Sequence, residues 1–263
     1  NIMSSAIIGY TGFIGSNLIR QRHFDNFYNS KNIETIHNQS FDLVICAGVP
    51  AVKWLANKEP VKDRENIQKL ISCLQKILTQ KFILISTVDV YISPIKVDEK
   101  TPIILEELQP YGKHRRELEC FVQDNFDSLI IRLPGLFGQG IKKNIIYDFL
   151  HNNLLEKIHQ DSVFQFYDLN HLWQDIELAL NHQLTLVNFA TEPTVVTEIA
   201  RCVFDLDFHN QPPLPIACYD MHTRYAPLLK GTQSPYIWDK ERVLQQLQQF
   251  VQQFKSKFYS NPK

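Results

Sequence analysis

The chain has 263 residues, of which 44% are hydrophobic and 21% are charged, and its formal net charge at pH 7 is −1. This length fits one large α/β domain or a domain with a smaller lobe. The near-neutral charge offers no field for nucleic acid or an anionic membrane, and no apolar run approaches the ~20 residues that span a bilayer. We therefore expect neither a nucleic-acid partner nor a membrane partner.

The cysteines and histidines exclude further classes. The five cysteines are an odd number with no close pair, which argues against a disulfide framework or a zinc site and fits reduced thiols. The nine histidines are scattered, so we expect no metal. We find no N-terminal segment in which charged residues are followed by an apolar run, so nothing in the sequence indicates export. Together these features predict a cytoplasmic protein.

The first element in the chain is the most informative. An apolar run at residues 6–8 leads into a glycine turn at residues 9–15, and a helical pattern follows from residue 14 to 19. Glycine permits positive φ and lets a pyrophosphate approach the backbone, while a helix N-terminus offers free N–H groups. Glycine also serves ordinary tight turns, but the flanking strand and helix favour a dinucleotide site. The predicted cofactor-binding residues of this turn are Gly9, Thr11, Gly12, Phe13, Ile14 and Gly15.

Apolar runs then alternate with helical patterns. We expect buried strands at residues 41–48, 81–87 and 128–134, and helices at residues 60–78 and 111–126. A proline-containing loop is expected at residues 93–110. This alternation is typical of a parallel sheet wrapped by helices. The sequence therefore predicts an α/β fold, a Rossmann-type doubly wound parallel sheet.

The remainder of the chain is less regular. We expect a helix near 169–180, a strand near 184–189, a helix near 197–204, a proline-rich loop at 211–215 and a last helix at 240–258. We predict a dinucleotide-binding domain at residues 1–160. Residues 161–263 would form a small C-terminal substrate lobe, interwoven with the last strands and helices of the main domain.

Three segments bring reactive groups to the carboxyl ends of the predicted strands, where such sheets bind ligands. Residues 86–91 end a strand with two hydroxyl groups. Tyr111 opens a helix, and Arg115 follows one turn later on the same face. Residues 133–138 supply backbone close to the expected position of a nicotinamide.

The order and spacing of these motifs resemble the extended short-chain dehydrogenase/reductases, the epimerase/dehydratase branch that mostly handles nucleotide sugars. The glycine turn matches that family's Gly-x-x-Gly-x-x-Gly, and residues 86–91 resemble its Ser-Ser/Thr-x-x-Val-Tyr strand end. Tyr111 matches the active-site tyrosine, Asn66 a helix asparagine, and Glu119 a glutamate eight residues beyond the tyrosine. Residues 132–134 and 137–140 resemble the Arg-x-Pro and Tyr-Gly-Pro-Gly segments of the family. Weaker similarity to the family continues to residue 240.

The resemblance implies a mechanism. Tyr111 would be the acid/base, Thr87 would orient the substrate oxygen, and Arg115 would clamp the ribose while a hydride moves to or from the nicotinamide. A free phenol has a pKa of about 10, so Tyr111 needs nearby positive charge. The cofactor site would also contain Ala47, Gly48, Leu133 and Pro134. In many relatives the helices at 60–78 and 111–126 form a dimer interface, so a homodimer is expected.

The chain departs from this pattern in ways that leave alternatives open. Arg115 stands where the family has lysine; arginine keeps the charge but is a poor proton relay, so a non-catalytic NADP(H)-binding protein is the second interpretation. Gly135 replaces an asparagine of the epimerases, and residues 162–166 lack their diphosphate-binding arginine. Lys142 and Lys143 either replace it or begin a solvated helix. We therefore favour a reductase of a small carbonyl substrate over a nucleotide-sugar epimerase or dehydratase.

The choice of cofactor depends on the end of the second strand. Enzymes that prefer NAD usually carry an acidic residue there, but residues 27–32 contain none. Ser30 and Lys31 either receive the 2′-phosphate of NADP or are turn residues. We predict NADP in preference to NAD. Lys53 and Trp54 either line the substrate pocket or have a capping or surface role.

Overall fold

The computed structural model describes residues 4–49 and 52–260, except the side chains of residues 259 and 260. The chain forms two compact units. The first contains the chain up to Ser93 together with Glu99–Leu133 and Asn170–Asn188. The second contains Pro94–Asp98, Pro134–Leu169 and the chain from Phe189 onward. The predicted division into residues 1–160 and 161–263 stays a prediction about folding domains.

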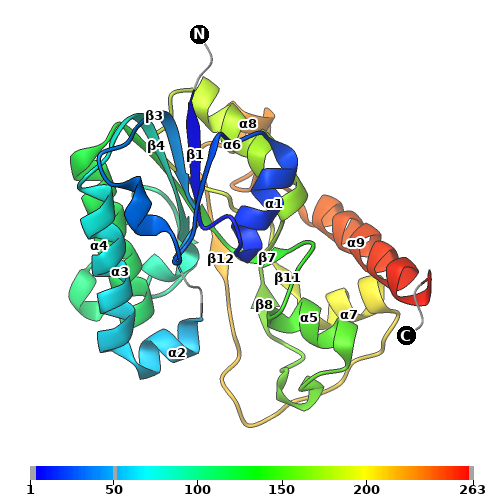
Figure 1. The fold of residues 1–263 in the computed structure, drawn as a ribbon. Helices are drawn as coiled ribbons and strands as arrows, with labels where there is room; N and C mark the ends of the chain where they lie inside the picture. Colours follow the sequence, from blue (N-terminus) through cyan, green and yellow to red (C-terminus); the bar gives the residue numbers. More distant parts are fainter. Residues whose placement is uncertain (1–3, 50–51, 261–263) are drawn as a thin grey trace. The chain divides into compact units, whose positions relative to one another are not determined.

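A six-stranded parallel sheet forms the centre of the first unit (Figure 1). Its strand order is β10-β6-β4-β3-β1-β2, and all neighbours are parallel. The strands are β1 Ser5–Ile8, β2 Asn26–Tyr28, β3 Ser40–Cys46, β4 Leu78–Thr87, β6 Ser128–Leu133 and β10 Leu186–Asn188. β1 and β6 are buried along their whole length, as expected where helices cover both faces of a parallel sheet.

Helices cover both faces of this sheet. They are α1 Phe13–Gln21, α2 Lys53–Lys58, α3 Pro60–Leu74, α4 Pro110–Asn125 and α6 Leu172–Asn181, with short 3-10 helices η1 Ile33–Ile36, η2 Val88–Val90 and η3 Leu105–Glu107. Figure 1 shows α3 and α4 together on one face and α1 with α6 on the other. The predicted Rossmann-type doubly wound sheet is therefore confirmed.

The core of the first unit lies where α3 and α4 pack on the sheet. Apolar side chains from these helices meet those of the central strands, among them Ile67, Leu74, Phe82, Leu118 and Val122. Phe82 also stacks on Phe126 with ring centroids 4.8 Å apart. This packing holds the N-terminal end of α4 close to the end of β4, which positions the candidate site.

The second unit is built from short strand pairs and helices. Its pairs are β7 Gly135–Phe137 with β9 Phe166–Asp168, β8 Val163–Phe164 with β11 Thr194–Val195, and β5 Ile95–Val97 with β12 Asp220–Met221. Its helices are α5 Asn144–His151, α7 Val196–Phe204, α8 Ala226–Lys230 and α9 Lys240–Ser260, with the 3-10 helix η4 Leu155–Lys157. α9 buries Val243, Leu247 and Val251, so it is a docking helix within this unit.

The structure corrects three details of the predicted elements. The helix predicted at residues 60–78 ends at Leu74, because Leu78 begins β4 and its N–H donates to the Gln39 carbonyl at 3.1 Å. The spacing of Leu74 and Leu78 fits a helix, but pairing with β3 prevails. α2 had no predicted counterpart, and the loop predicted at residues 93–110 contains β5. Within the described residues, no helix is both long and apolar enough to cross a membrane.

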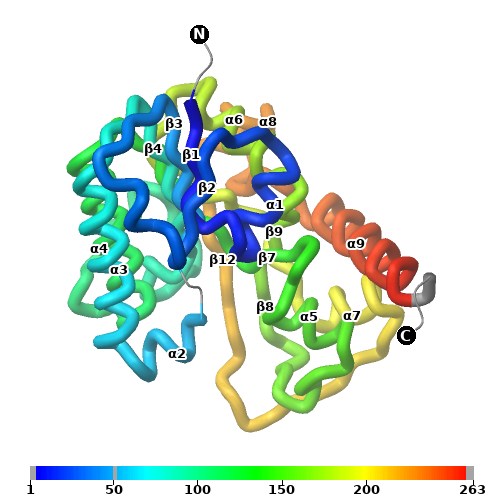
Figure 2. Tube along the Cα trace, viewed as in Figure 1, coloured from blue at the N-terminus to red at the C-terminus, as the bar shows by residue number. Residues whose placement is uncertain are grey.

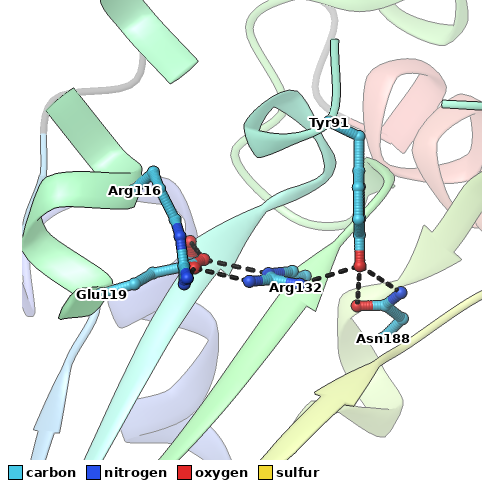
Figure 3. Close-up of polar contacts among 6 residues, drawn as sticks. Tyr91, Arg116, Glu119, Arg132 and Asn188 are labelled. Carbon is cyan, nitrogen blue, oxygen red and sulfur yellow. Dashed lines mark hydrogen bonds and ion pairs between the residues drawn. The ribbon is translucent and has the colours of Figure 1, made fainter. Parts of the chain in front are cut away.

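A buried polar network joins four elements of the first unit (Figure 3). Glu119 on α4 and Arg132 on β6 form a bidentate ion pair, with Nη2–Oε1 at 2.7 Å and Nε–Oε2 at 3.1 Å. The Tyr91 hydroxyl, just beyond η2, accepts from Arg132 Nη1 at 2.8 Å and from Asn188 Nδ2 at 2.8 Å. Since Asn188 ends β10, the network ties α4 to the carboxyl ends of the strands.

Glu119 has further donors around its carboxylate. Ser86 on β4 donates to Oε2 at 2.5 Å, and Arg116 donates to Oε1 at 3.0 Å. Burial lowers the pKa of Arg132, but bonding to Glu119 outweighs it and raises that pKa above its ordinary value. Arg132 is therefore charged, and the Ser86 hydroxyl is a structural group beside the candidate site.

We expect Arg132→Met to lower the free energy of unfolding by about 3–5 kcal/mol, because it leaves the Glu119 charge buried without its main partner. The double variant Glu119→Leu/Arg132→Met should recover part of this loss. Arg64→Ala, which breaks the partly exposed Arg64–Glu117 pair (2.9 Å), should cost less than about 1 kcal/mol and is the matched control. Urea unfolding measures the free energy of unfolding of all three variants. An Arg132→Met variant as stable as wild type would contradict the importance of the buried Glu119–Arg132 pair.

Candidate functional site

The candidate site lies at the carboxyl edge of the sheet in the first unit. In the sheet, β2 lies next to β1 on one side, and β3 lies next to β1 on the other side. The chain therefore changes direction between β1 and β3, the topological switch point at which such sheets bind ligands. Figure 2 shows the path from β1 through the glycine turn into α1 and on to β2.

Gly9 lies where the backbones of two strand ends almost touch. Its φ is +90°, and a Cβ there would lie 2.2 Å from the Gly48 Cα. The Gly9 N–H donates to the Tyr28 carbonyl at 2.7 Å, and the Ala47 N–H donates to the Ile8 carbonyl at 2.8 Å. The turn after β1 is thus held between the ends of β2 and β3, and only glycine fits at residue 9.

Gly12 and Gly15 differ in what they do for the fold. A Cβ at Gly15 would lie 1.9 Å from the Gly9 carbonyl oxygen, so this glycine lets α1 pack onto the turn. A Cβ at Gly12 would make only an ordinary contact, 3.5 Å from that same oxygen, and its φ of −77° suits any residue. The fold itself does not require glycine at residue 12. A ligand that approaches the backbone closely would require it.

The N-terminus of α1 has features that favour the binding of an anion. Gly12 is the N-cap residue without a side-chain cap, and the first turn holds no acidic residue. Thr11 and Gly12 are exposed, while Phe13 and Ile14 are partly exposed. The N–H groups of the first turn have no partner within a helix, and the helix dipole adds positive potential. This is the geometry of a pyrophosphate-binding helix N-terminus.

The loop after β2 is a tight turn held by asparagines. Asn32 Oδ1 accepts from the Asn29 N–H at 2.7 Å, and Asn29 Oδ1 accepts from the Lys31 N–H at 3.0 Å. These bonds present the side chains of Ser30 and Lys31 to solvent. The structure brings both residues to the same sheet edge as the glycine turn, which Gly9 joins to Tyr28 at the end of β2.

Tyr111 occupies the first turn of α4 and is 7% exposed. Its backbone N–H donates to Asn57 Oδ1 at 2.9 Å, which satisfies one of the free donors of the helix. A Cβ at Gly112 would lie 2.1 Å from the Asp89 carbonyl oxygen. Gly112 therefore lets α4 pack directly on η2, which brings Tyr111 close to the end of β4.

Arg115 is engaged by a residue that the sequence did not point to. Its guanidinium donates to Asp63 Oδ2 on α3 at 2.5 Å and to the Tyr111 carbonyl at 3.3 Å. It also covers the Tyr111 ring, with Cζ 4.0 Å from the centroid. His114 Nδ1 lies 2.6 Å from the same Asp63 oxygen, and all three side chains are buried. The role of Arg115 as a ribose clamp stays a prediction.

Thr87, Asp89 and Lys53 form a chain of hydrogen bonds. The Thr87 hydroxyl donates to Asp89 Oδ2 at 3.1 Å, and Lys53 Nζ donates to Asp89 Oδ1 at 2.6 Å. The side chains of Lys53 and Asp89 are 48% and 20% exposed. Sequence reasoning considered Lys53 only as a pocket-lining or surface residue and gave Asp89 no role, because the pairing joins residues 36 positions apart.

The charges around Tyr111 nearly cancel. Burial raises the pKa of its phenol above the ordinary value; Arg115 and Lys53 oppose this, while Asp89 and Asp63 reinforce it. Tyr111 is thus protonated at neutral pH in this structure. A buried phenol in that state can donate a proton.

The remaining predicted residues lie at the end of β6. Leu133 is buried and pairs in register with Thr87. Pro134 follows it directly and begins a segment of the second unit. Asn66, the helix asparagine of the resemblance, lies instead on α3, in the lining of a small hollow that also contains Leu55 and Asp63.

Comparison with known proteins supports the fold. By sequence, the chain matches no protein-family model and no curated protein. It is similar to the structure of UDP-glucose 4-epimerase from Thermotoga maritima with UDP-glucose, with a TM-score of 0.73, 16% identity, and 97% of this chain and 100% of that chain covered.

Two further structures are comparably similar. One is an NAD-dependent NDP-hexosamine 5,6-dehydratase involved in tunicamycin biosynthesis, with a TM-score of 0.75, 15% identity, and 97% and 98% of the two chains covered. The other is a dTDP-4-dehydrorhamnose reductase from Clostridium acetobutylicum, with a TM-score of 0.71, 15% identity, and 96% and 100% covered. The chain therefore shares the fold of these three structures along almost its whole length.

We expect Asp63→Ala to lower the free energy of unfolding by about 3–5 kcal/mol at pH 7, because Arg115 and His114 lose the carboxylate they share in the protein interior. Asp127→Ala, which removes an exposed partner of Lys81, should cost less than about 1 kcal/mol and is the control.

This difference should depend on pH. Burial raises the pKa of Asp63, but its bonds to Arg115 and His114 outweigh that and lower the pKa below the ordinary value. The stabilisation is therefore fully present above about pH 4, the pKa of an unfolded aspartate, and is lost as pH falls through the lower folded value. Urea unfolding between pH 7 and 2.5 measures it. A gap between wild type and Asp63→Ala that stays constant to pH 2.5 would contradict the prediction.

Proposed function

We propose that the protein is a divergent extended short-chain dehydrogenase/reductase, an NAD(P)-dependent oxidoreductase that reduces a carbonyl group of a small molecule. The observation that carries the proposal is the backbone cradle formed by Gly9, Gly12 and the N-terminus of α1, which lies at the same carboxyl edge of the sheet as Thr87. The similar structures bear the names of an epimerase, an NAD-dependent dehydratase and a reductase, so a sugar or nucleotide sugar is the substrate class to test first.

The residues take separate roles in this proposal. The α1 N-terminus and the open backbone at Gly12 hold the pyrophosphate of the dinucleotide, whose nicotinamide supplies the hydride when bound. Thr87 donates or accepts a hydrogen bond to orient the substrate oxygen. Tyr111, protonated in its buried setting, gives that oxygen a proton. The protonated phenol is the form that a carbonyl reduction uses.

We propose NADP rather than NAD as the cofactor. The turn after β2 holds no acid to bond a ribose 2′-hydroxyl, and it presents Ser30 and the Lys31 ammonium to solvent beside the cradle. A 2′-phosphate gains from a nearby cation. The named NAD-dependent dehydratase among the similar structures makes the comparison of the two cofactors necessary.

The second candidate function is a non-catalytic NADP(H)-binding protein. The observation that favours it is the commitment of Arg115 to Asp63, which removes a cation of the family's catalytic pattern from general use. Such a protein binds the dinucleotide and turns over no substrate. A nucleotide-sugar epimerase or dehydratase is the third candidate, and it would retain its cofactor without consuming it.

We also propose a cytoplasmic homodimer that pairs through α3 and α4. The exposed side of α3 carries Lys62, Arg64, Glu65 and Lys69, so an interface there would bring charged side chains of both protomers together. Sedimentation at low and high salt measures it.

Gly12→Asp separates binding from folding. The variant adds a carboxylate at the N-cap of α1, where Cβ has room and aspartate favours the helix, so the thermal midpoint should stay equal or rise. The same carboxylate repels a pyrophosphate, and we expect the affinity for NADP and NAD to fall at least about 10-fold.

Titration calorimetry with both dinucleotides measures the affinities, and Gly12→Ala serves as the uncharged control. Gly15→Ala is unsuitable, because its Cβ would clash with the Gly9 carbonyl. Undiminished dinucleotide binding by Gly12→Asp would refute the proposed cradle.

Tyr111→Phe tests the chemistry. Loss of the proton donor should slow hydride transfer by about 10²–10⁴-fold with dinucleotide affinity unchanged. Nicotinamide absorbance measures the rate with sugar nucleotides, ketones and aldehydes. If no substrate is turned over faster by wild type than by Tyr111→Phe, the non-catalytic function is the correct one.

A further inference from the structure

Tyr111 is buried, so a proton that it gives away must be replaced by a defined route. At 7% exposure the side chain has little contact with water. A bound substrate would reduce that contact further. In a reduction, the phenol donates its proton to the carbonyl oxygen and remains as phenolate, which must be reprotonated before the next turnover.

Arg115 is not suited to this task. A guanidinium does not lose its proton in proteins, since its pKa is above 12. Here it is also held in place by Asp63 at 2.5 Å, and its Cζ lies 4.0 Å from the centroid of the phenol ring. It can therefore orient the ring and add positive charge, but it cannot pass a proton on.

The chain Thr87–Asp89–Lys53 connects the same place to solvent. Its two side-chain hydrogen bonds are 3.1 and 2.6 Å long, and its far end, Lys53, is about half exposed. Gly112, the residue after Tyr111, packs on the Asp89 carbonyl, so the first turn of α4 lies against the segment that holds this chain. Asp89 and Lys53 both act on the charge of the phenol, and the other ionised groups that do so are Arg115 and Asp63.

We propose that Lys53, Asp89 and Thr87 form the route by which protons reach Tyr111 from solvent. Lys53 is a positioning residue at the outer end of the route, Asp89 links it to Thr87, and Thr87 serves the phenol. This inference rests on the proposed reductase function, and it assigns to Lys53 a task that Arg115 cannot perform.

The proton balance closes without any electron transfer. Lys53 gives a proton from Nζ to the Asp89 carboxylate, and Asp89 passes a proton to the Thr87 oxygen. For this transfer the Thr87 hydroxyl turns away from Asp89, to which it donates in the structure, and its own proton moves to the Tyr111 phenolate. Lys53 then takes a proton from water, so one proton enters at Lys53 and one arrives at Tyr111. An ordinary lysine has a pKa of about 10.4, and burial raises the pKa of the Tyr111 phenol above its ordinary value, so the overall transfer to the phenolate is favourable.

The test compares Lys53→Met and Lys53→Arg at low buffer concentration. Both should lower the steady-state rate at least about 10-fold while the first turnover, which uses the proton already on Tyr111, keeps its wild-type rate. Imidazole added as a proton carrier should restore Lys53→Met toward the wild-type rate. Lys58→Met, an exposed lysine change on the same helix, is the control and should behave as wild type.

Three outcomes overturn the proposal. Lys53→Met with a wild-type steady-state rate shows that no proton passes this residue. Rescue by Lys53→Arg alone shows that only charge matters, because arginine does not release protons. A Lys53→Met defect that imidazole leaves unchanged shows a structural role. Failure of the proposed function is distinct from these: wild type then shows no first turnover at all, while dinucleotide binding is still measured by calorimetry, and the route falls with the function.

Discussion

The ion pair between Glu119 and Arg132 organises the first unit. It lies in the protein interior between α4 and β6, and through Tyr91 and Asn188 it reaches the segment after β4 and the end of β10 (Figure 3). Two buried charges are costly unless their hydrogen bonds are satisfied, so the elements that supply those bonds can occupy few other positions. The candidate site depends on this restraint, because Tyr111 begins the helix that carries Glu119, and Thr87 follows Ser86, whose hydroxyl bonds the same carboxylate.

A second buried charge cluster sets the electrostatics of the site. Asp63 holds Arg115 and His114, and Arg115 in turn covers the Tyr111 ring. The Lys53–Asp89 ion pair also acts on the Tyr111 phenol and is partly exposed. Because each cation near the phenol has its own anion, the pairs add little net charge, and burial determines the direction of the phenol's pKa. A phenol kept protonated in this way is suited to donate a proton rather than to abstract one.

The sequence predicted those features that depend on local chemistry. The glycine turn after β1 and the buried strands could be predicted because glycine spacing and apolar runs report directly on backbone geometry and burial. Asp63 could not, since its role arises only when α3 packs against α4 and its sequence neighbours are ordinary helix residues. The end of α3 was misplaced for a similar reason: Leu78 fits a helical pattern, and only its pairing with β3 makes it a strand residue. Partners distant in sequence decide such cases.

Binding and chemistry therefore rest on different kinds of constraint in this protein. The proposed dinucleotide cradle depends on backbone approach, where Gly9 and Gly15 leave no room for any side chain and Gly12 leaves its backbone open. The proposed proton transfer depends on side chains that belong to α2, η2, α3 and α4 and meet only in the folded chain. Arg115, at the position where the resembled family has lysine, belongs to the side chains of the second set and not to the backbone of the first. The backbone of the cradle can thus stay the same while the charged side chains around Tyr111 differ. Asp63 and Lys53 are two of the charged residues that act on the Tyr111 phenol.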